Sequence, residues 1–127
     1  MVSQSGLDTS IKERHSLIGS DRVQGTAVYR SNGEKVGTID RVMIDKISGK
    51  VAYAVMSFGG FLGIGEEYYP LPWKLLTYNT RLEGYEVNIG EEQLKSAPKY
   101  SAHETWDWTN RGQIDDYYKV GPYWSAT

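Results

Sequence analysis

Short stretches of alternating hydrophobic and polar residues, separated by turn residues, fill the middle of the chain. The first covers residues 22–29 and leads into Asn32-Gly33, a pair typical of tight hairpins because both residues tolerate a positive φ. A second, β-branched stretch follows over residues 35–47. Its hydrophobic positions shift by one residue near Asp40-Arg41, which predicts a β-bulge. The pattern therefore predicts a two-stranded hairpin at the start of the folded region.

The next two stretches predict the interior of a sheet. Residues 50–58 are hydrophobic on both faces, as expected for a central strand or for a strand of a small closed sheet. Residues 68–76 form a further predicted strand, which carries Pro70 and Pro72. Because residues two apart donate toward the same side of a strand, these prolines predict an edge that is unpaired or bulged there. Trp73 follows them directly and is predicted to anchor the core.

A half-exposed strand and a short helix complete the predicted elements. Residues 85–89 alternate between hydrophobic and polar positions, as expected for a strand with one solvated face. Residues 90–95 predict one short helical turn that stops before Pro98. Five or six short strands within about 80 residues are typical of a small barrel or sandwich.

Composition divides the chain into three zones. We expect the polar residues 1–16 to form a flexible N-terminal arm. Residues 17–99 hold most of the aliphatic residues and turn signals, and they are predicted to form the folded domain. Residues 100–127 are predicted to be an aromatic-rich C-terminal extension that packs on that domain or on a partner subunit. Its aromatic residues are Tyr100, Trp106, Trp108, Tyr117, Tyr118, Tyr123 and Trp124.

Several segments of the middle zone, in this order and spacing, resemble a known family. They are Leu17-Ile18-Gly19, Gly33-Glu34-Lys35-Val36-Gly37-Thr38-Ile39, Val42-Met43-Ile44-Asp45, Gly49-Lys50-Val51-Ala52-Tyr53-Ala54-Val55 and Tyr69-Pro70-Leu71-Pro72-Trp73. Together they resemble the PRC-barrel family over about residues 17–97. That family includes the cytoplasmic domain of the photosynthetic reaction centre H subunit and the C-terminal domain of the ribosome-maturation factor RimM.

The resemblance implies a mainly β fold: a small, strongly bent antiparallel β-barrel with one short helical turn, here followed by the aromatic-rich extension. It also implies a domain that binds other macromolecules and carries no chemistry of its own. The H subunit has a membrane helix ahead of its barrel, and RimM has a second barrel there. We expect neither ahead of residue 17 in this chain, so neither specific function transfers.

Charge and composition narrow the classes of partner. The formal net charge is −2, and the whole imbalance lies in residues 100–127. No basic stripe is present, which disfavours nucleic acid as a partner. Cysteine is absent, which excludes disulfides and thiolate ligands. The longest uninterrupted hydrophobic run has six residues, far short of the about 20 that a membrane span needs. We expect a soluble, cytoplasmic protein.

The glycine-rich stretch 59–65 is the first candidate for binding chemistry. A phosphate-cradling loop needs a following helix or a Lys-Ser/Thr pair, but two glutamates and a strand-like segment follow here. The alternative is a hairpin loop with Phe61, Leu62 and Ile64 at its tip. Such a tip folds back on its own domain or meets a partner, and we favour the partner.

The titratable residues form no recognisable catalytic or metal-binding motif. His15 and His103 are the only histidines, and His103-Glu104 lacks the second histidine of a zinc-binding helix motif. Asp40 and Asp45 are expected to be bulge and turn residues. Asp115 and Asp116 are expected to lie in a solvated stretch. We therefore predict no catalytic residues, no metal site and no cofactor.

The sequence favours a non-enzymatic adaptor module that mediates protein–protein association, either as a homodimer or with another protein. The alternative is an RNA- or ribosome-associated maturation factor resembling RimM. Because Tyr and Trp are enriched where protein surfaces meet, the aromatic extension is the predicted self-association surface. The predicted interface residues are Phe61, Leu62, Ile64, Trp106, Trp108, Tyr118, Tyr123 and Trp124.

Overall fold

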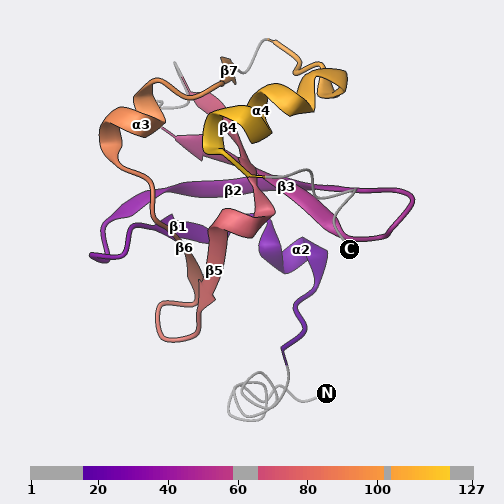
Figure 1. The fold of residues 1–127 in the computed structure, drawn as a ribbon. Coiled ribbons are helices and arrows are strands. Elements are labelled where there is room, and N and C mark those ends of the chain that lie inside the picture. Colours follow the sequence, from indigo (N-terminus) through magenta and orange to yellow (C-terminus); the bar gives the residue numbers. More distant parts are fainter. Residues whose placement is uncertain (1–15, 59–65, 102–103, 121–127) are drawn as a thin grey trace.

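A computed structural model describes residues 16–58, 66–101 and 104–120 of the chain. It is a seven-stranded sheet with short helices on both sides of its two long central strands (Figure 1). In chain order the elements are α2 (Ser20–Val23), β1 (Ala27–Tyr29), β2 (Lys35–Ile44), β3 (Val51–Phe58), β4 (Glu67–Pro72), the 3₁₀ turn η1 (Trp73–Leu75), β5 (Leu76–Asn79), β6 (Gly84–Val87), α3 (Glu91–Lys95), β7 (Tyr100–Ser101), the 3₁₀ turn η2 (Trp108–Asn110) and α4 (Arg111–Tyr118).

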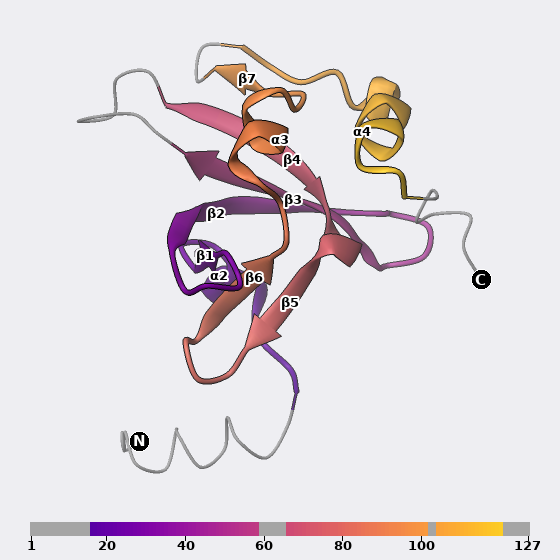
Figure 2. The same ribbon diagram turned by 60° about the vertical axis from the view of Figure 1, so that its left-hand side comes forward.

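The strands follow the order β5-β6-β1-β2-β3-β4-β7 across one bent sheet (Figure 2). Within the described residues the sheet is open, because β5 and β7 do not pair with each other. The predicted mainly β fold is thus confirmed. The strand pairing of the described residues does not confirm the predicted closed barrel. The expected antiparallel pairing does not hold between β1 and β6, which pair in parallel.

The hairpin of β1 and β2 forms as its turn residues predict. Gly33 has a φ of +89°, and the Asn32 side chain accepts a hydrogen bond from the Glu34 amide at 2.9 Å. The strand register between β2 and β3 shifts between Ile39 and Arg41, which confirms the predicted bulge. The predicted first strand is too long, however. Residues 20–23 form α2 instead, and β1 begins only at Ala27.

Gly37 in β2 lies where this strand approaches β3 closely. A Cβ atom at this position would collide with the Ser57 carbonyl oxygen and lie 2.9 Å from the Met56 Cγ atom. The absence of a side chain therefore allows β2 and β3 to approach closely at this position.

β3 is a central strand, as its two hydrophobic faces predict. It pairs with β2 on one side and β4 on the other, and Ala54, Val55 and Met56 are fully buried. Pro70 and Pro72 pair with β3, whereas β7 pairs only with the first two residues of β4. The far side of β4 is therefore unpaired at both prolines among the described residues, which confirms the predicted edge.

The stretch 68–76 is not one strand. It divides into β4, η1 and the start of β5. Trp73 consequently lies in η1, where it is half-buried and packs against the core with its ring 5.2 Å from that of Tyr85. The predicted helical turn at residues 90–95 is present as α3. The sequence predicted one helical segment, which is too few, because α2 and α4 are helices as well.

The C-terminal region contributes to the core of the sheet. α4 packs against β4 (Figures 1 and 2). Ile114 is fully buried, and Tyr118 is 7% exposed in the same hydrophobic cluster as Val28, Met56 and Leu71. Since Ile114 and Tyr118 are four residues apart, they lie on the same face of the helix. The core of this small sheet is thus completed by residues beyond position 99.

Candidate association surface

The turn between β2 and β3 is held by side-chain hydrogen bonds. Asp45 accepts one from the Ile47 amide at 3.2 Å and one from the Ser48 hydroxyl at 2.9 Å, and Gly49 has a φ of +78°. The Ser48 hydroxyl, together with the Ile47 amide, lowers the pKa of the Asp45 carboxyl. Asp45 is therefore a turn residue, as predicted. We call residues 44–50 the hairpin tip.

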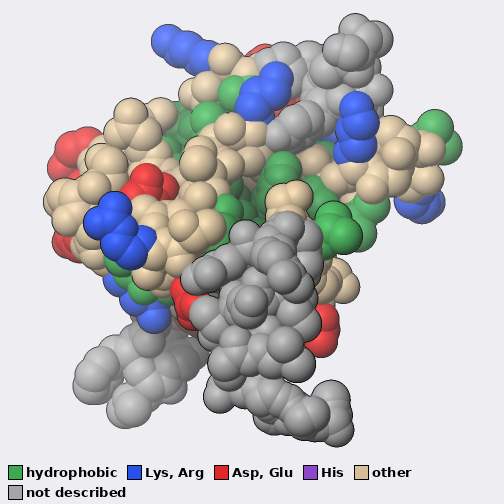
Figure 3. Space-filling model, turned by 90° about the horizontal axis from the view of Figure 1, so that it is seen from below, with side chains coloured by type: hydrophobic (Ala, Val, Ile, Leu, Met, Phe, Trp, Pro, Cys, Tyr) green, Lys and Arg blue, Asp and Glu red, His purple; other side chains and the backbone are tan. Residues whose placement is uncertain are grey.

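The hairpin tip carries exposed hydrophobic side chains. Ile47 is 94% exposed and Ile44 is 52% exposed. In Figure 1 this hairpin extends to the right of the sheet, and in Figure 3 a hydrophobic and a basic side chain stand at that end of the molecule. The turn requires Asp45, Ser48 and Gly49 but makes no demand on the side chain of residue 47. Neither the turn nor the core explains an isoleucine there.

The base of the hairpin packs against the C-terminal region. The Trp108 ring lies 5.5 Å from the ring of Tyr53, and the Arg111 guanidinium lies 5.1 Å above the same tyrosine ring. A small cavity of about 70 Å³ opens here, between the hairpin and the start of α4. The cavity lies against the contact between the Tyr53 and Trp108 rings.

A buried polar cluster joins α4 to β3. The Tyr53 hydroxyl donates a hydrogen bond of 2.7 Å to the Asp115 carboxylate, and Arg111 Nε donates to the Tyr53 oxygen at 3.4 Å. Burial raises the pKa of Tyr53 to about 12, and the bond to Asp115 acts in the same direction. Burial also raises the pKa of Asp115, against the opposing effect of the tyrosine hydrogen bond. The cluster fixes the position of α4.

The expectation that Asp115 lies in a solvated stretch is wrong. Asp115 is 5% exposed and faces the sheet, whereas Asp116 is exposed. Asp40 lies at the β2 bulge, where its carboxylate accepts a hydrogen bond from Arg41 at 3.2 Å. The structure does not bring these carboxylates together as an acid–base pair. The useful sequence signal was the spacing of Ile114 and Tyr118, which places Asp115 on the inner side of a helix.

The aromatic residues of the C-terminal region form a row on their own sheet. Successive ring centroids from Tyr68 through Tyr100, Trp106 and Trp108 to Tyr53 are 5.4, 6.0, 6.3 and 5.5 Å apart. Trp106 and Trp108 are half-buried. Each therefore keeps some surface for a partner, although both rings already contact neighbours in the same chain.

Of the other predicted interface residues, one is buried and the rest lie outside the described residues. Tyr118 is buried in the core, so its ring is not available at the surface. Of the remaining candidates, Phe61, Leu62 and Ile64 in the glycine-rich loop, and Tyr123 and Trp124 near the C-terminus, lie outside the described residues.

A groove separates α4 from the segment that follows α3. It has a volume of about 400 Å³ and is lined by Ser96, Ala97, Pro98, Gln113, Asp116 and Tyr117. The Tyr117 hydroxyl donates a hydrogen bond to the Gln93 carbonyl oxygen, which ties α4 to α3. Ala97 is 4% exposed and Tyr117 is half-buried. The groove thus has a hydrophobic floor with Asp116 at its rim. We call it the α3–α4 groove.

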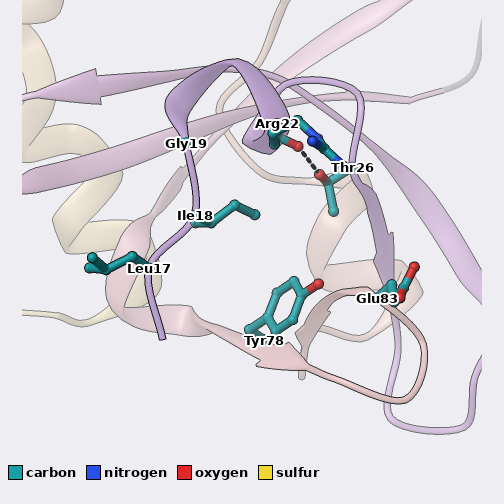
Figure 4. A pocket seen from close by; sticks show the side chains of 7 residues that line it. All are labelled: Leu17, Ile18, Gly19, Arg22, Thr26, Tyr78 and Glu83. Carbon is teal, nitrogen blue, oxygen red and sulfur yellow. Dashed lines mark hydrogen bonds between the residues drawn. The ribbon is translucent and has the colours of Figure 1, made fainter. Parts of the chain in front are cut away.

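A second hollow of about 300 Å³ lies beside α2, where Ile18 points into the space above Tyr78 of β5 and Leu17 points away from it (Figure 4). Leu17 is 82% exposed and Tyr78 is 41% exposed. The polar side of the hollow is formed by Arg22, Thr26 and Glu83, with the Thr26 hydroxyl donating to the Arg22 carbonyl oxygen at 2.6 Å.

Across residues 16–58, 66–101 and 104–120, no three acidic or histidine side chains are grouped so that they could hold a metal ion. Both histidines and the glycine-rich loop lie outside these ranges. None of the helices in the described residues is long and hydrophobic enough to cross a membrane.

No curated protein matches the chain. Among solved structures, one similar chain is a Pseudomonas aeruginosa protein named as the 16S ribosomal RNA processing protein RimM. The two share 13% identity and a TM-score of 0.37, and the alignment covers 64% of this chain and 49% of that one. This chain therefore matches about half the length of that protein.

A family model agrees with the resemblance noted in the sequence. The model described as the PRC-barrel domain matches residues 16–94, which is more than half of the 127 residues. The matched range begins just before α2 and ends in α3, so it includes every strand from β1 to β6. The chain belongs to the PRC-barrel domain family.

Proposed function

We propose that this PRC-barrel chain is a non-enzymatic association module that forms a homodimer in the cytoplasm. The observation that carries the proposal is the hairpin tip, where Ile47 is 94% exposed and Ile44 is 52% exposed. Two aliphatic side chains at the end of a projecting hairpin lose contact with water most effectively when a partner covers them.

The hairpin tip is well suited to binding because it is ordered before it meets a partner. The Asp45 hydrogen bonds hold the turn, and the Asp45 amide donates to the Lys50 carbonyl oxygen at 2.8 Å. Ordering a loop on binding weakens affinity, so a turn that is already fixed avoids that cost. A small sheet with few core residues also gains stability from dimerisation.

Most of the other predicted interface residues are kept in this proposal. Trp108 packs beneath the hairpin and holds its base against η2, and Trp106 stands next to it in the aromatic row. Phe61, Leu62, Ile64, Tyr123 and Trp124 stay proposed contact residues. Tyr118 is no longer among them, because its ring belongs to the core.

The mass of the intact chain in solution tests the proposal. We expect sedimentation velocity to give a concentration-dependent species of twice the 14.3 kDa chain mass. A monomer at every concentration would overturn the proposal. Tight binding to ribosomal RNA that weakens steeply as salt is added would also overturn it. Such salt dependence indicates contacts with phosphates, and it would favour the RNA-associated alternative.

A further inference from the structure

We propose that the dimer is built by reciprocal exchange: the hairpin tip of each copy occupies the α3–α4 groove of the other. This inference rests on the proposed self-association and names the two surfaces that meet. One is the convex tip, with Ile47 between Lys46 and Ser48. The other is the groove floored by Ala97, Pro98 and Tyr117.

The hairpin tip projects from the sheet, whereas the α3–α4 groove is a shallow depression. Ile47 is the most exposed hydrophobic side chain of the described residues, at 94%. The α3–α4 groove is an open hollow of about 400 Å³ on a different part of the molecule. A few side chains near the centre of a protein interface, packed in pockets from which water is excluded, carry most of its binding energy.

The groove is held open by its own structure. Tyr117 is fixed by its hydrogen bond to the Gln93 carbonyl oxygen and by edge-to-face contact with Tyr118, whose ring centroid lies 4.9 Å away. Ala97 is anchored by a backbone hydrogen bond of 3.1 Å to Leu94, which is itself buried. Both walls are therefore attached to the core, and binding requires little rearrangement.

The charges of the two surfaces are complementary. The hairpin tip contains two lysines and one aspartate, a formal charge of +1, whereas Asp116 is the charged residue among the six that line the α3–α4 groove. Lys46 and Asp116 are both exposed, and neither forms a salt bridge with another described residue. Lys46 beside Ile47 would meet Asp116 at the groove rim, which fixes the orientation of the tip.

The positions of the two surfaces require a second copy. In Figure 1 the β2–β3 hairpin extends to the right, whereas α3 lies at the left of the sheet. A chain cannot place its own tip in its own groove without unfolding the hairpin. Two tip–groove contacts related by a twofold axis satisfy both surfaces of both copies and close the assembly at two chains.

The test uses the full chain and single substitutions at exposed positions. Ile47→Asp removes the tip side chain, and Asp116→Lys reverses the charge at the groove rim. Leu82→Asp is the matched control, because Leu82 is a 38% exposed hydrophobic residue in the turn between β5 and β6. We expect all three variants to fold, because each altered side chain is at least partly exposed. Their unfolding temperatures check this.

We expect Ile47→Asp and Asp116→Lys each to raise the dimer dissociation constant about tenfold or more, as removal of an interface anchor does. Leu82→Asp should leave the constant unchanged. Adding Lys46→Glu to Asp116→Lys should restore part of the lost affinity by exchanging the two charges. A dimer that tolerates Ile47→Asp would overturn the inference while leaving the proposed self-association intact. A monomeric wild-type chain would overturn both.

Mixing the two weakened variants tests reciprocity itself. The Ile47→Asp chain keeps an intact groove, and the Asp116→Lys chain keeps an intact tip. An equimolar mixture should therefore form heterodimers with one intact contact and bind more tightly than either variant alone. No gain on mixing would contradict reciprocal exchange. Growth of the wild type into open chains beyond a dimer would contradict the closed twofold arrangement.

Discussion

Helix α4 and the hairpin tip each contain an isoleucine, and the two residues lie in opposite environments. Ile114 of α4 is fully buried, whereas Ile47 of the tip is 94% exposed. Composition alone suggests the reverse. The C-terminal region is rich in Trp and Tyr, residues typical of interfaces, while the aliphatic stretch around β2 and β3 has the composition of a core.

The difference shows what a high density of aromatic residues means in a small sheet. Rings such as Trp108 and Tyr118 bury a large area per residue, so a short segment can complete a thin core. The hairpin tip instead exposes two aliphatic side chains, Ile44 and Ile47, to which neither the turn nor the core assigns a role.

Shortening the two isoleucines gives the largest expected contrast. Ile114→Ala should lower the free energy of unfolding by about 2–5 kcal/mol, because it leaves a cavity in a packed core. Ile47→Ala should change it by about 0.5 kcal/mol or less, since an exposed side chain in a monomer has few contacts to lose. Denaturant unfolding, at a protein concentration at which the chain is monomeric, measures both free-energy changes. Equal effects would remove the distinction between the two regions.

Breaking the polar contact between β3 and α4 gives the next effect. Tyr53→Phe and Asp115→Asn should each lower the free energy of unfolding by about 1–3 kcal/mol, because each disturbs a buried hydrogen bond. Since the two side chains share one bond, the double variant should lose less than the sum of the single losses. Strict additivity in this cycle would show that α4 is held by other contacts.

Alkaline pH should weaken the attachment of α4 in a predictable range. The folded chain holds the Tyr53 proton to about pH 12, whereas an unfolded tyrosine releases it near its ordinary pKa of 10.0. The stabilising contribution is therefore complete below pH 10 and is lost as the pH rises toward 12. Tyr53→Phe should show a shallower loss of stability over this range in a pH series of denaturant unfolding curves. Parallel curves would argue against the raised pKa.

The smallest expected effect is a gain in the free energy of unfolding. Gly112 lies in α4, has no positive φ, and a Cβ atom there would meet no other atom within 4 Å. Gly112→Ala should raise the free energy of unfolding by about 0.4–1 kcal/mol, because alanine restricts the unfolded chain. Its dimer dissociation constant should match the wild type, because residue 112 does not line the α3–α4 groove. A loss of stability on substitution would mean that this part of α4 is more crowded than the structure shows.

Local turn chemistry allowed much of the sheet to be predicted from the sequence. Asn32-Gly33, the bulge after Ile39 and the two prolines of β4 each act through backbone geometry that neighbouring residues determine. The division of residues 68–76 into two strands was not predictable in this way. It depends on where Trp73 finds space beside Tyr85, a contact between residues distant in sequence.

The candidate surface was harder to predict for the same reason. Whether Trp108 or Ile47 is covered depends on the path of residues beyond position 99, and local patterns do not encode that path. The helix of α4 was missed because Gly112 and two aspartates favour a loop, although Ile114 and Tyr118 have helical spacing. Packing of these two side chains on the sheet outweighs the local preference.

Methyl NMR of the isoleucine side chains over a dilution series tests the central claim most directly, because Ile47 and Ile114 report from the two regions in one experiment. We predict that the Ile47 methyl resonance shifts or broadens as the concentration enters the range in which the mass doubles, while the Ile114 resonance stays fixed. An Ile47 resonance that does not change across that range would contradict the account, since a dimer would then form without the hairpin tip.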